Sequence, residues 1–270
     1  RFAERITRRI FKEGGYTTAT CSATRDRRRA LKDCDCVIIS ILAGGYPAIE
    51  AEIDIPMKYG VSQAIGDTLT PGGIMRCLRT LPMLADVARD VRERCPRAHV
   101  LNYTNPMSML CGGVTRAVPE VRLTGLCHSV QGCVHIWARR LGIPHAEINF
   151  QCAGINHQAW MLRMEHHGKD LLPRIRALAL KPEIWLGDTS RMEYIKHLGY
   201  PVTESSGHNS EYSPWFRKNT RTIAQYCPNG RWNGEHGFIK QLYNRKDWRQ
   251  TMERMATWQQ PVPLARSSEY

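Results

Sequence analysis

Residues 35–42 read Asp35-Cys36-Val37-Ile38-Ile39-Ser40-Ile41-Leu42 and are the strongest indication of the fold class. Its almost unbroken apolar run predicts a parallel strand that is buried on both faces. Gly44 and Gly45 follow this run within three residues. Because the ligands of α/β sheets bind at the carboxyl ends of the strands, we expect both glycines to contact a bound cofactor.

Strand and helix patterns alternate three times in the first half of the chain. After residues 35–42, further strands are expected at 100–103 and 121–126, and helices at 107–118 and 130–141. This alternation is typical of the α/β class and predicts a doubly wound parallel sheet.

A long amphipathic helix is expected around residues 78–91, with Leu78 on its core face. Pro82 lies inside this pattern and predicts a kink or a break. Residues 17–22 are rich in threonine and are expected to form a strand.

The pattern changes near residue 145. Residues 148–155 and 158–164 look like antiparallel strands, so a second, mixed α+β region is expected there. We therefore predict two domains, 1–144 and 145–270. The first residue is Arg1, and the alternation is entered partway through. We expect the start of the first domain and the end of the second to lie outside this sequence.

The composition excludes several classes of protein. The 270 residues carry 38 Lys+Arg against 25 Asp+Glu, a formal net charge of +13. No nucleic-acid-binding motif accompanies the basic residues, so we interpret them as a solvated, arginine-rich surface rather than a nucleic-acid site. No apolar run approaches the roughly 18 residues that a membrane span needs. Ten cysteines without a CxxC pair predict reduced thiols and a cytoplasmic location.

Polar side chains follow the expected strands at three places. Asn105 follows one strand, Cys127 and His128 follow the next, and Asn156 and His157 follow a third. Since the carboxyl ends of parallel strands line one crevice, these side chains are expected to converge. A thiolate with a neutral imidazole suits a divalent transition metal. Cys127 and His157 are therefore candidate metal ligands, although a buried core thiol is the alternative for Cys127.

The neighbouring residues have more than one interpretation. His128 is either a third ligand or a proton donor, and we favour the donor because its ordinary pKa lies near neutrality. The amide of Asn105 would bind a sugar hydroxyl or a nicotinamide carboxamide, unless it only begins a turn. Asn156 is expected to contact substrate, and His208 is a further candidate.

Six motifs occur in order along the chain: IPMKYGV (55–61), GDTLTPGG (66–73), NYTNPM (102–107), GLCHSVQG (125–132), AGINHQAW (153–160) and VTESS (202–206). With them, the chain resembles family 4 glycoside hydrolases, and within that family the α-galactosidase-like branch, over residues 24–248. The resemblance implies a Rossmann-like fold and an α-glycosidase that depends on NAD and Mn²⁺, an exception to the scheme of two catalytic carboxylates. In the implied reaction, NAD⁺ takes hydride from C3 of the sugar and a base removes the C2 proton. The aglycone leaves by elimination, water adds, and the hydride returns. The metal polarises the C2 and C3 oxygens.

The resemblance also implies roles for single residues. They are Cys127 and His157 as Mn²⁺ ligands, His128 as the acid for the departing oxygen, Asn105 as a contact of substrate and cofactor, Asp67 as support for the base, and Tyr212 as the base. A packed aromatic is the alternative for Tyr212, because a phenol needs a lowered pKa to act as a base near neutrality.

The substrate and the assembly are less closely defined. Family members that act on phospho-sugars carry an arginine soon after the two glycines, whereas residues 46–49 here read YPAI. We therefore expect an unphosphorylated glycoside as the small-molecule substrate, with galactose, glucose and galacturonate all open. A homo-oligomer, dimer or tetramer, is expected. The competing interpretations are an NAD-dependent dehydrogenase of the malate or lactate type and an inactive, truncated homologue.

Overall fold

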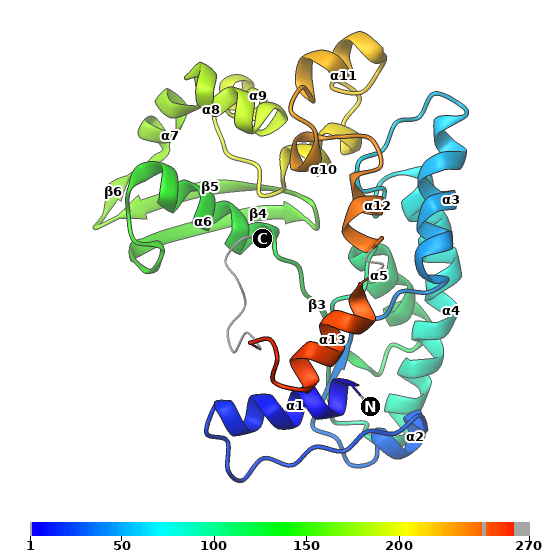
Figure 1. Ribbon diagram of the computed structural model, residues 1–270. Coiled ribbons are helices and arrows are strands. Elements are labelled where there is room, and N and C mark those ends of the chain that lie inside the picture. The colour runs from blue at the N-terminus through cyan, green and yellow to red at the C-terminus, as the bar shows by residue number, and fades with distance from the viewer. Residues whose placement is uncertain (1, 245–246, 262–270) are drawn as a thin grey trace.

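The chain builds two separate three-stranded sheets, shown in Figure 1. The computed structural model describes residues 2–244 and 247–261. The first sheet contains β1 (Cys36–Ile39), β2 (His99–Asn102) and β3 (Arg122–Gly125) in that order. All of its strands are parallel, which confirms the predicted α/β class.

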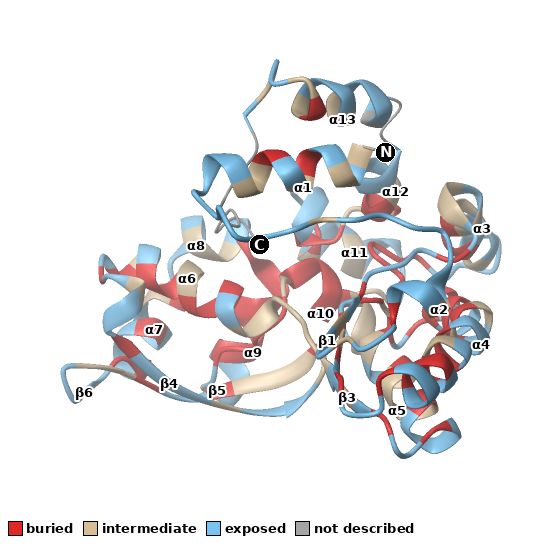
Figure 2. Ribbon diagram, turned by 90° about the horizontal axis from the view of Figure 1, so that it is seen from below, coloured by how far each residue is buried: buried red, intermediate tan, exposed pale blue. Residues whose placement is uncertain are grey.

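The parallel sheet is covered on one face within the described residues. Ile39 of β1 is buried together with side chains of α4 (Pro71–Arg94) and α5 (Met107–Ala117). Ile38, on the opposite face, is 65% exposed. The exposed residues of β1 alternate with covered ones, as the colours of Figure 2 indicate. The expectation of a strand buried on both faces is therefore wrong for this structure.

Helix α4 runs without a break through Pro82. It begins at the side chain of Thr70, which accepts a hydrogen bond from the backbone N–H of Gly73. Proline removes one hydrogen bond of the helix, but Leu84 just beyond it is buried in the core and holds the helix in place. The predicted break is wrong, and Leu78, expected on the core face, is exposed.

The second sheet is antiparallel and begins with a long hairpin. It contains β4 (Ile148–Ile155), β5 (Gln158–His166) and β6 (Lys169–Asp170), which confirms the expected antiparallel pair. Its core also takes in α6 (Ser129–Leu141), α7 (Leu172–Ala179) and α9 (Thr189–Leu198). Helix α6 thus packs on the second sheet although it precedes residue 145. The boundary at 144/145 stays a prediction.

The remaining helices connect and flank the two sheets. They are α1 (Phe2–Glu13), α2 (Arg27–Ala30), α3 (Gly45–Met57), α8 (Pro182–Gly187), α10 (Ser206–Tyr212), α11 (Thr220–Tyr226), α12 (Phe238–Tyr243) and α13 (Trp248–Ala256). Helices α1 and α13, from opposite ends of the described chain, pack together in both views. Helix α12 packs on α3.

Residues 17–22 form no strand, so that expectation is wrong. A threonine-rich segment favours extended backbone, but a strand also needs a partner, and no described segment pairs with this one.

No helix in the described ranges is long and apolar enough to cross a membrane. The last nine residues of the predicted second domain, 262–270, lie outside the described part of the chain.

Candidate active site

The carboxyl ends of the parallel strands open into a cavity of about 1290 Å³. Ser40 lines it after β1, Asn105 after β2, and Cys127 and His128 after β3. His157 reaches the same cavity from the turn between β4 and β5. The structure thus brings together four residues expected to converge: Asn105, Cys127, His128 and His157.

Cys127 and His157 lie in direct contact. The Sγ atom of Cys127 is 3.2 Å from Nε2 of His157, and an oxygen of Glu204 is 3.5 Å from the same nitrogen. Donor atoms of these three residues all lie within 4.8 Å of one another. A thiolate, an imidazole and a carboxylate form a donor set that suits a divalent transition metal. Of the three, Glu204 was not singled out as a ligand from the sequence.

His157 occupies an unusual backbone conformation. Its φ angle is 62°, in the left-handed region that residues other than glycine seldom adopt. Such a conformation at a hairpin turn turns the imidazole toward the cavity while the strands on either side stay paired. The local strain coincides with the group of candidate ligands, as strain at functional sites often does.

The thiol of Cys127 is poised to lose its proton. Burial alone would raise its pKa, but hydrogen bonds with His128 and His157 outweigh burial and lower the pKa of Cys127 to about 5. The buried Cys133 on α6 has no such partners, and burial raises its pKa to about 11. Cys127 is therefore a thiolate near neutral pH, the form that binds metal ions.

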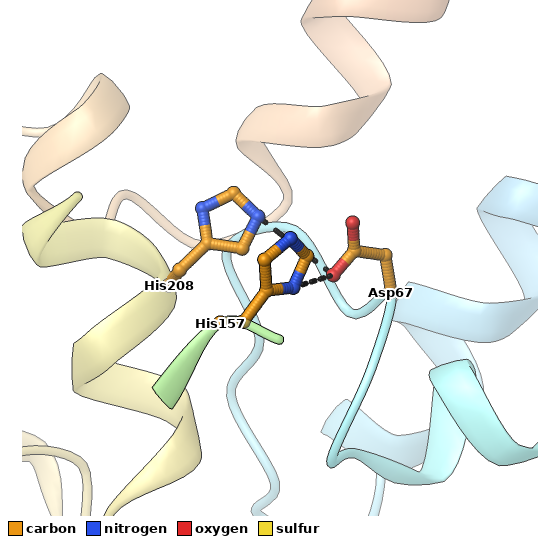
Figure 3. A group of neighbouring side chains, drawn as sticks. All are labelled: Asp67, His157 and His208. Atoms are coloured by element: carbon orange, nitrogen blue, oxygen red, sulfur yellow. Dashed lines mark ion pairs between the residues drawn. The ribbon is translucent and has the colours of Figure 1, made fainter. Parts of the chain in front are cut away.

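A second group of charges lies behind the imidazole of His157, drawn in Figure 3. One oxygen of Asp67 is 3.7 Å from Nδ1 of His157 and 3.7 Å from Nε2 of His208. The hydroxyl of Tyr212 donates a hydrogen bond of 2.5 Å to the same oxygen. Thr68 adds a hydroxyl 3.0 Å from Nδ1 of His157. These contacts join the loop before α4, the β4–β5 turn and helix α10.

Electrostatics fix the charges of this second group. Burial would raise the pKa of Asp67, but His157 and His208 hold it well below its ordinary range. Burial would lower the pKa of His208, but Glu204 and Asp67 raise it to about 10. His208 therefore stays protonated near neutral pH and balances part of the buried negative charge. His208 was a candidate site residue in the sequence analysis, but no role was predicted for it.

Tyr212 acts as a donor in this arrangement. Burial, with the nearby charges of Asp67 and Glu211, raises the pKa of Tyr212 well above its ordinary value. This direction is opposite to the lowering that a catalytic base would need. The base role of Tyr212 stays a prediction, and its observed contact is the hydrogen bond to Asp67.

Three further residues expected at the site lie at its margin or away from it. Gly44 precedes α3 with a φ angle of 83°, and a Cβ there would lie 2.7 Å from that of Ala48. Gly45 is the first residue of α3, and neither glycine lines the cavity among the described residues. Asn156 adjoins His157, and its side-chain oxygen is buried without a partner in the described part of the chain. Their binding roles stay predictions.

The segment that carries Glu204 is held from behind by a buried arginine. Arg191 on α9 donates two hydrogen bonds, of 2.7 and 3.0 Å, to the backbone oxygen of Glu204. Asp188 accepts from Arg191 at 2.8 Å and from the hydroxyl of Ser206 at 2.6 Å. Arg140 of α6 is also 3.0 Å from Asp188. A buried ion cluster therefore joins α6, α9 and the start of α10, and no local sequence signal indicated it.

Comparison with known proteins places the chain in a family. The sequence model for family 4 glycosyl hydrolases matches residues 3–143, and the model for the C-terminal domain of the same family matches residues 152–270. The chain belongs to the family 4 glycosyl hydrolases.

Two curated relatives are α-galactosidases. One, from Bacillus subtilis (strain 168), is 46% identical over 195 residues, covering 72% of this chain and 45% of that protein. The other, from Rhizobium meliloti (strain 1021), is 36% identical over 237 residues, covering 85% of this chain and 48% of that protein. The chain thus spans about half the length of these relatives.

Solved structures share the fold. LplD from Bacillus subtilis, a suggested glucosidase, is 28% identical with a TM-score of 0.76, covering 93% of this chain and 61% of that one. A 6-phospho-α-glucosidase from gut microorganisms, solved in complex with NAD and Mn²⁺, has a TM-score of 0.70 at 18% identity. That alignment covers 95% of this chain and 57% of the other. The second likeness concerns the fold alone.

Proposed function

We propose that this chain forms the catalytic region of an α-galactosidase that depends on NAD and a divalent metal ion. The main support for the proposal is the group formed by Cys127, His157 and Glu204, which lies in one cavity with Asp67, the hydrogen-bond acceptor of Tyr212. The identity of 46% to an α-galactosidase supports the choice of sugar.

The donor set fits the proposed metal. Cys127 is a thiolate near neutral pH, Glu204 has a pKa below its ordinary value, and His157 offers Nε2 toward both. Burial opposes the charge on Glu204, but His208 and His157 outweigh it. We assign Cys127, His157 and Glu204 to Mn²⁺ or a similar ion.

The sheet edge fits a nicotinamide. Ser40 and Asn105 stand at the carboxyl ends of β1 and β2 and line the cavity with neutral polar groups. An amide side chain such as Asn105 can both donate to and accept from a carboxamide. When bound, NAD would supply a hydride acceptor and donor for C3 of the sugar, and the metal would polarise the oxygens on C2 and C3.

Two side chains of this chain are assigned to the two proton transfers, one to the aglycone oxygen and one from C2. His128 faces the cavity from the start of α6 and is assigned to protonate the oxygen of the departing aglycone. Tyr212 is assigned to remove the C2 proton as a phenolate. This role requires that the charge of a bound metal ion lower the pKa of Tyr212, which burial, Asp67 and Glu211 otherwise raise. Asp67 orients the phenol through their hydrogen bond. Asn156 is assigned to the sugar. The proposed order is C3 oxidation, C2 deprotonation, loss of the aglycone, addition of water and return of hydride.

An unphosphorylated galactoside is the proposed substrate. Residues 46–49 lie in α3 and offer no arginine after the two glycines. A cytoplasmic location and a homo-oligomeric state complete the proposal.

The test is cleavage of p-nitrophenyl α-galactoside by the complete protein as the cell makes it. NAD⁺ and Mn²⁺ are each supplied or withheld, and Cys127→Ser is compared with Cys21→Ser, a matched loss of a thiol outside the cavity. We expect cleavage that needs both additions, survives in Cys21→Ser and disappears in Cys127→Ser. Cleavage indifferent to both additions would indicate a conventional hydrolase. No cleavage of any glycoside would favour the dehydrogenase or the inactive homologue.

A further inference from the structure

A carboxylate outside the proposed catalytic set binds a row of backbone amides beside Asp67. One oxygen of Glu211 accepts from the N–H of Ala64 at 2.7 Å, and the other accepts from the N–H of Gly66 at 3.1 Å. The N–H of Ile65 is 3.2 Å from each oxygen. Three successive amides of one loop therefore converge on a single side chain.

The residues that follow Gly66 and Glu211 in the chain are Asp67 and Tyr212, of which Tyr212 is the proposed base and Asp67 its hydrogen-bond partner. The two segments are thus joined twice, once by Glu211 on the amides and once by the 2.5 Å hydrogen bond from Tyr212 to Asp67. Helix α10 supplies His208, Glu211 and Tyr212 at positions i, i+3 and i+4, which share one helical face.

The carboxylate is the form of this side chain whose geometry fits the amides, although burial raises the pKa of Glu211 against the opposing effect of His208. Its two oxygens are both acceptors, so they satisfy all three N–H groups of Ala64, Ile65 and Gly66. Hydrogen bonds from N–H groups to an ionised acceptor are stronger than neutral ones. A glutamine has one acceptor oxygen, and its NH₂ group would face an amide N–H.

We propose that Glu211 is a positioning residue that fastens the 64–66 loop to α10 and so sets the geometry of the Asp67–Tyr212 pair. The inference rests on the proposed function, in which Tyr212 removes the C2 proton. Glu211 touches neither substrate nor cofactor in this role. It acts through Asp67 and Tyr212, where a displacement of about 1 Å can lower a rate roughly 100-fold.

The experiment uses Glu211→Gln in the complete protein, with Asp170→Asn as the matched control. Asp170 also accepts from a backbone amide, that of Leu172 at 2.9 Å, but lies on β6 away from the cavity. Two readouts are taken: kcat and KM for p-nitrophenyl α-galactoside with NAD⁺ and Mn²⁺, and the distance from the Tyr212 hydroxyl to Asp67 in a crystal structure of each variant.

Positioning predicts a split between the two kinetic constants. In Glu211→Gln, kcat should fall about 10- to 100-fold while KM changes by less than about 3-fold, and the Tyr212–Asp67 distance should exceed hydrogen-bonding range. Asp170→Asn should match the unmodified protein in all of these. An unchanged kcat in an active protein would overturn the proposal. So would an intact Tyr212–Asp67 hydrogen bond in the crystal structure of the variant.

The crystal distance also separates this inference from the proposed function. If the unmodified protein cleaves no glycoside, the proposed function fails, and the distance alone decides whether Glu211 holds the pair. Should Glu211→Gln not fold, Glu211→Asp is measured in the same way. It keeps the charge but shortens the side chain by one methylene, so the same loss of geometry is expected.

Discussion

Cys127, just before α6, and Cys133, within α6, show how strongly the surroundings of a thiol determine its pKa. Cys127 and Cys133 both line the cavity, yet the pKa of the first is lowered to about 5 and that of the second raised to about 11. Burial acts against the charge on both thiols. Only Cys127 has imidazoles beside its sulfur to outweigh it.

This contrast predicts an unusual alkylation profile for Cys127. Between pH 7 and pH 6, iodoacetamide should modify Cys127 at a nearly constant rate, because a thiol with a pKa of about 5 stays ionised. An ordinary thiol, with a pKa near 8.5, loses about 10-fold in rate over the same interval. Peptide mass spectrometry gives the rate at each cysteine, and the exposed Cys36 is the internal reference. A 10-fold fall at Cys127 would contradict the thiolate assignment.

The sequence was sufficient to name some residues of the candidate site and not others. Cys127 and His157 stand directly after strand patterns, so a local signal placed them. Glu204 was not predicted, and His208 was predicted without a role, because both reach the site from a segment whose path depends on the packing of α9 and α10. Such tertiary contacts leave no periodic pattern in the sequence.

Helix α9 contributes a buried salt bridge that supports the site from behind. Asp188 and Arg191 are both almost fully buried, and Arg191 holds the backbone of Glu204. Burial would raise the pKa of Asp188, but Arg191 and Arg140 lower it. The charge of Asp188 therefore helps to hold Arg191, and Arg191 in turn holds the backbone of Glu204, a candidate metal ligand.

Replacement of Asp188 by asparagine should destabilise the protein in a pH-dependent way. At pH 7, Asp188→Asn leaves the charge of Arg191 buried without its partner, which costs about 3–5 kcal/mol in free energy of unfolding. Because the folded-state pKa of Asp188 is lowered, its stabilisation is present above the unfolded-state pKa of about 4 and is lost as pH falls through the folded-state pKa.

Urea unfolding of the unmodified protein and of Asp188→Asn between pH 7 and pH 3.5 measures the difference in their free energies of unfolding. The gap in free energy of unfolding should be widest near neutrality and narrow below about pH 4. Asp86→Asn is the control, since its ion pair with Arg89 is exposed and contributes less than about 1 kcal/mol. A gap that stays constant with pH would contradict the assigned charge of Asp188.

Several elements were predicted from the sequence, and the errors share a physical cause. Strands β1 to β5 followed from apolar or alternating patterns, which favour extended backbone even where a strand is largely exposed, as in β1 and β4. Residues 17–22 have strand propensity but no strand to pair with. Pro82 tends to break a helix, but the buried side chains of α4 keep the helix continuous. Helix α3 was not predicted, although it contributes Ile49 and Ile53 to a core with α12.

In the whole molecule, the cavity lies between the strand ends of the parallel sheet and the β4–β5 turn of the antiparallel sheet. The parallel sheet contributes the strand ends, the antiparallel sheet contributes His157, and α10 contributes His208. Figure 1 shows α10 between the antiparallel sheet and the helices beside the parallel sheet. The sequence predicted both sheets, but it did not predict that α6 would pack on the second one.

Cleavage in D₂O shows directly whether the C2 proton of the sugar is removed. The complete protein, with NAD⁺ and Mn²⁺, cleaves p-nitrophenyl α-galactoside, and NMR spectroscopy records the hydrogen at C2 of the released sugar. Removal of the C2 proton followed by elimination and addition predicts deuterium from the solvent at C2. Cleavage that leaves the original hydrogen at C2 would contradict the proposed elimination, because a conventional hydrolase never breaks that bond.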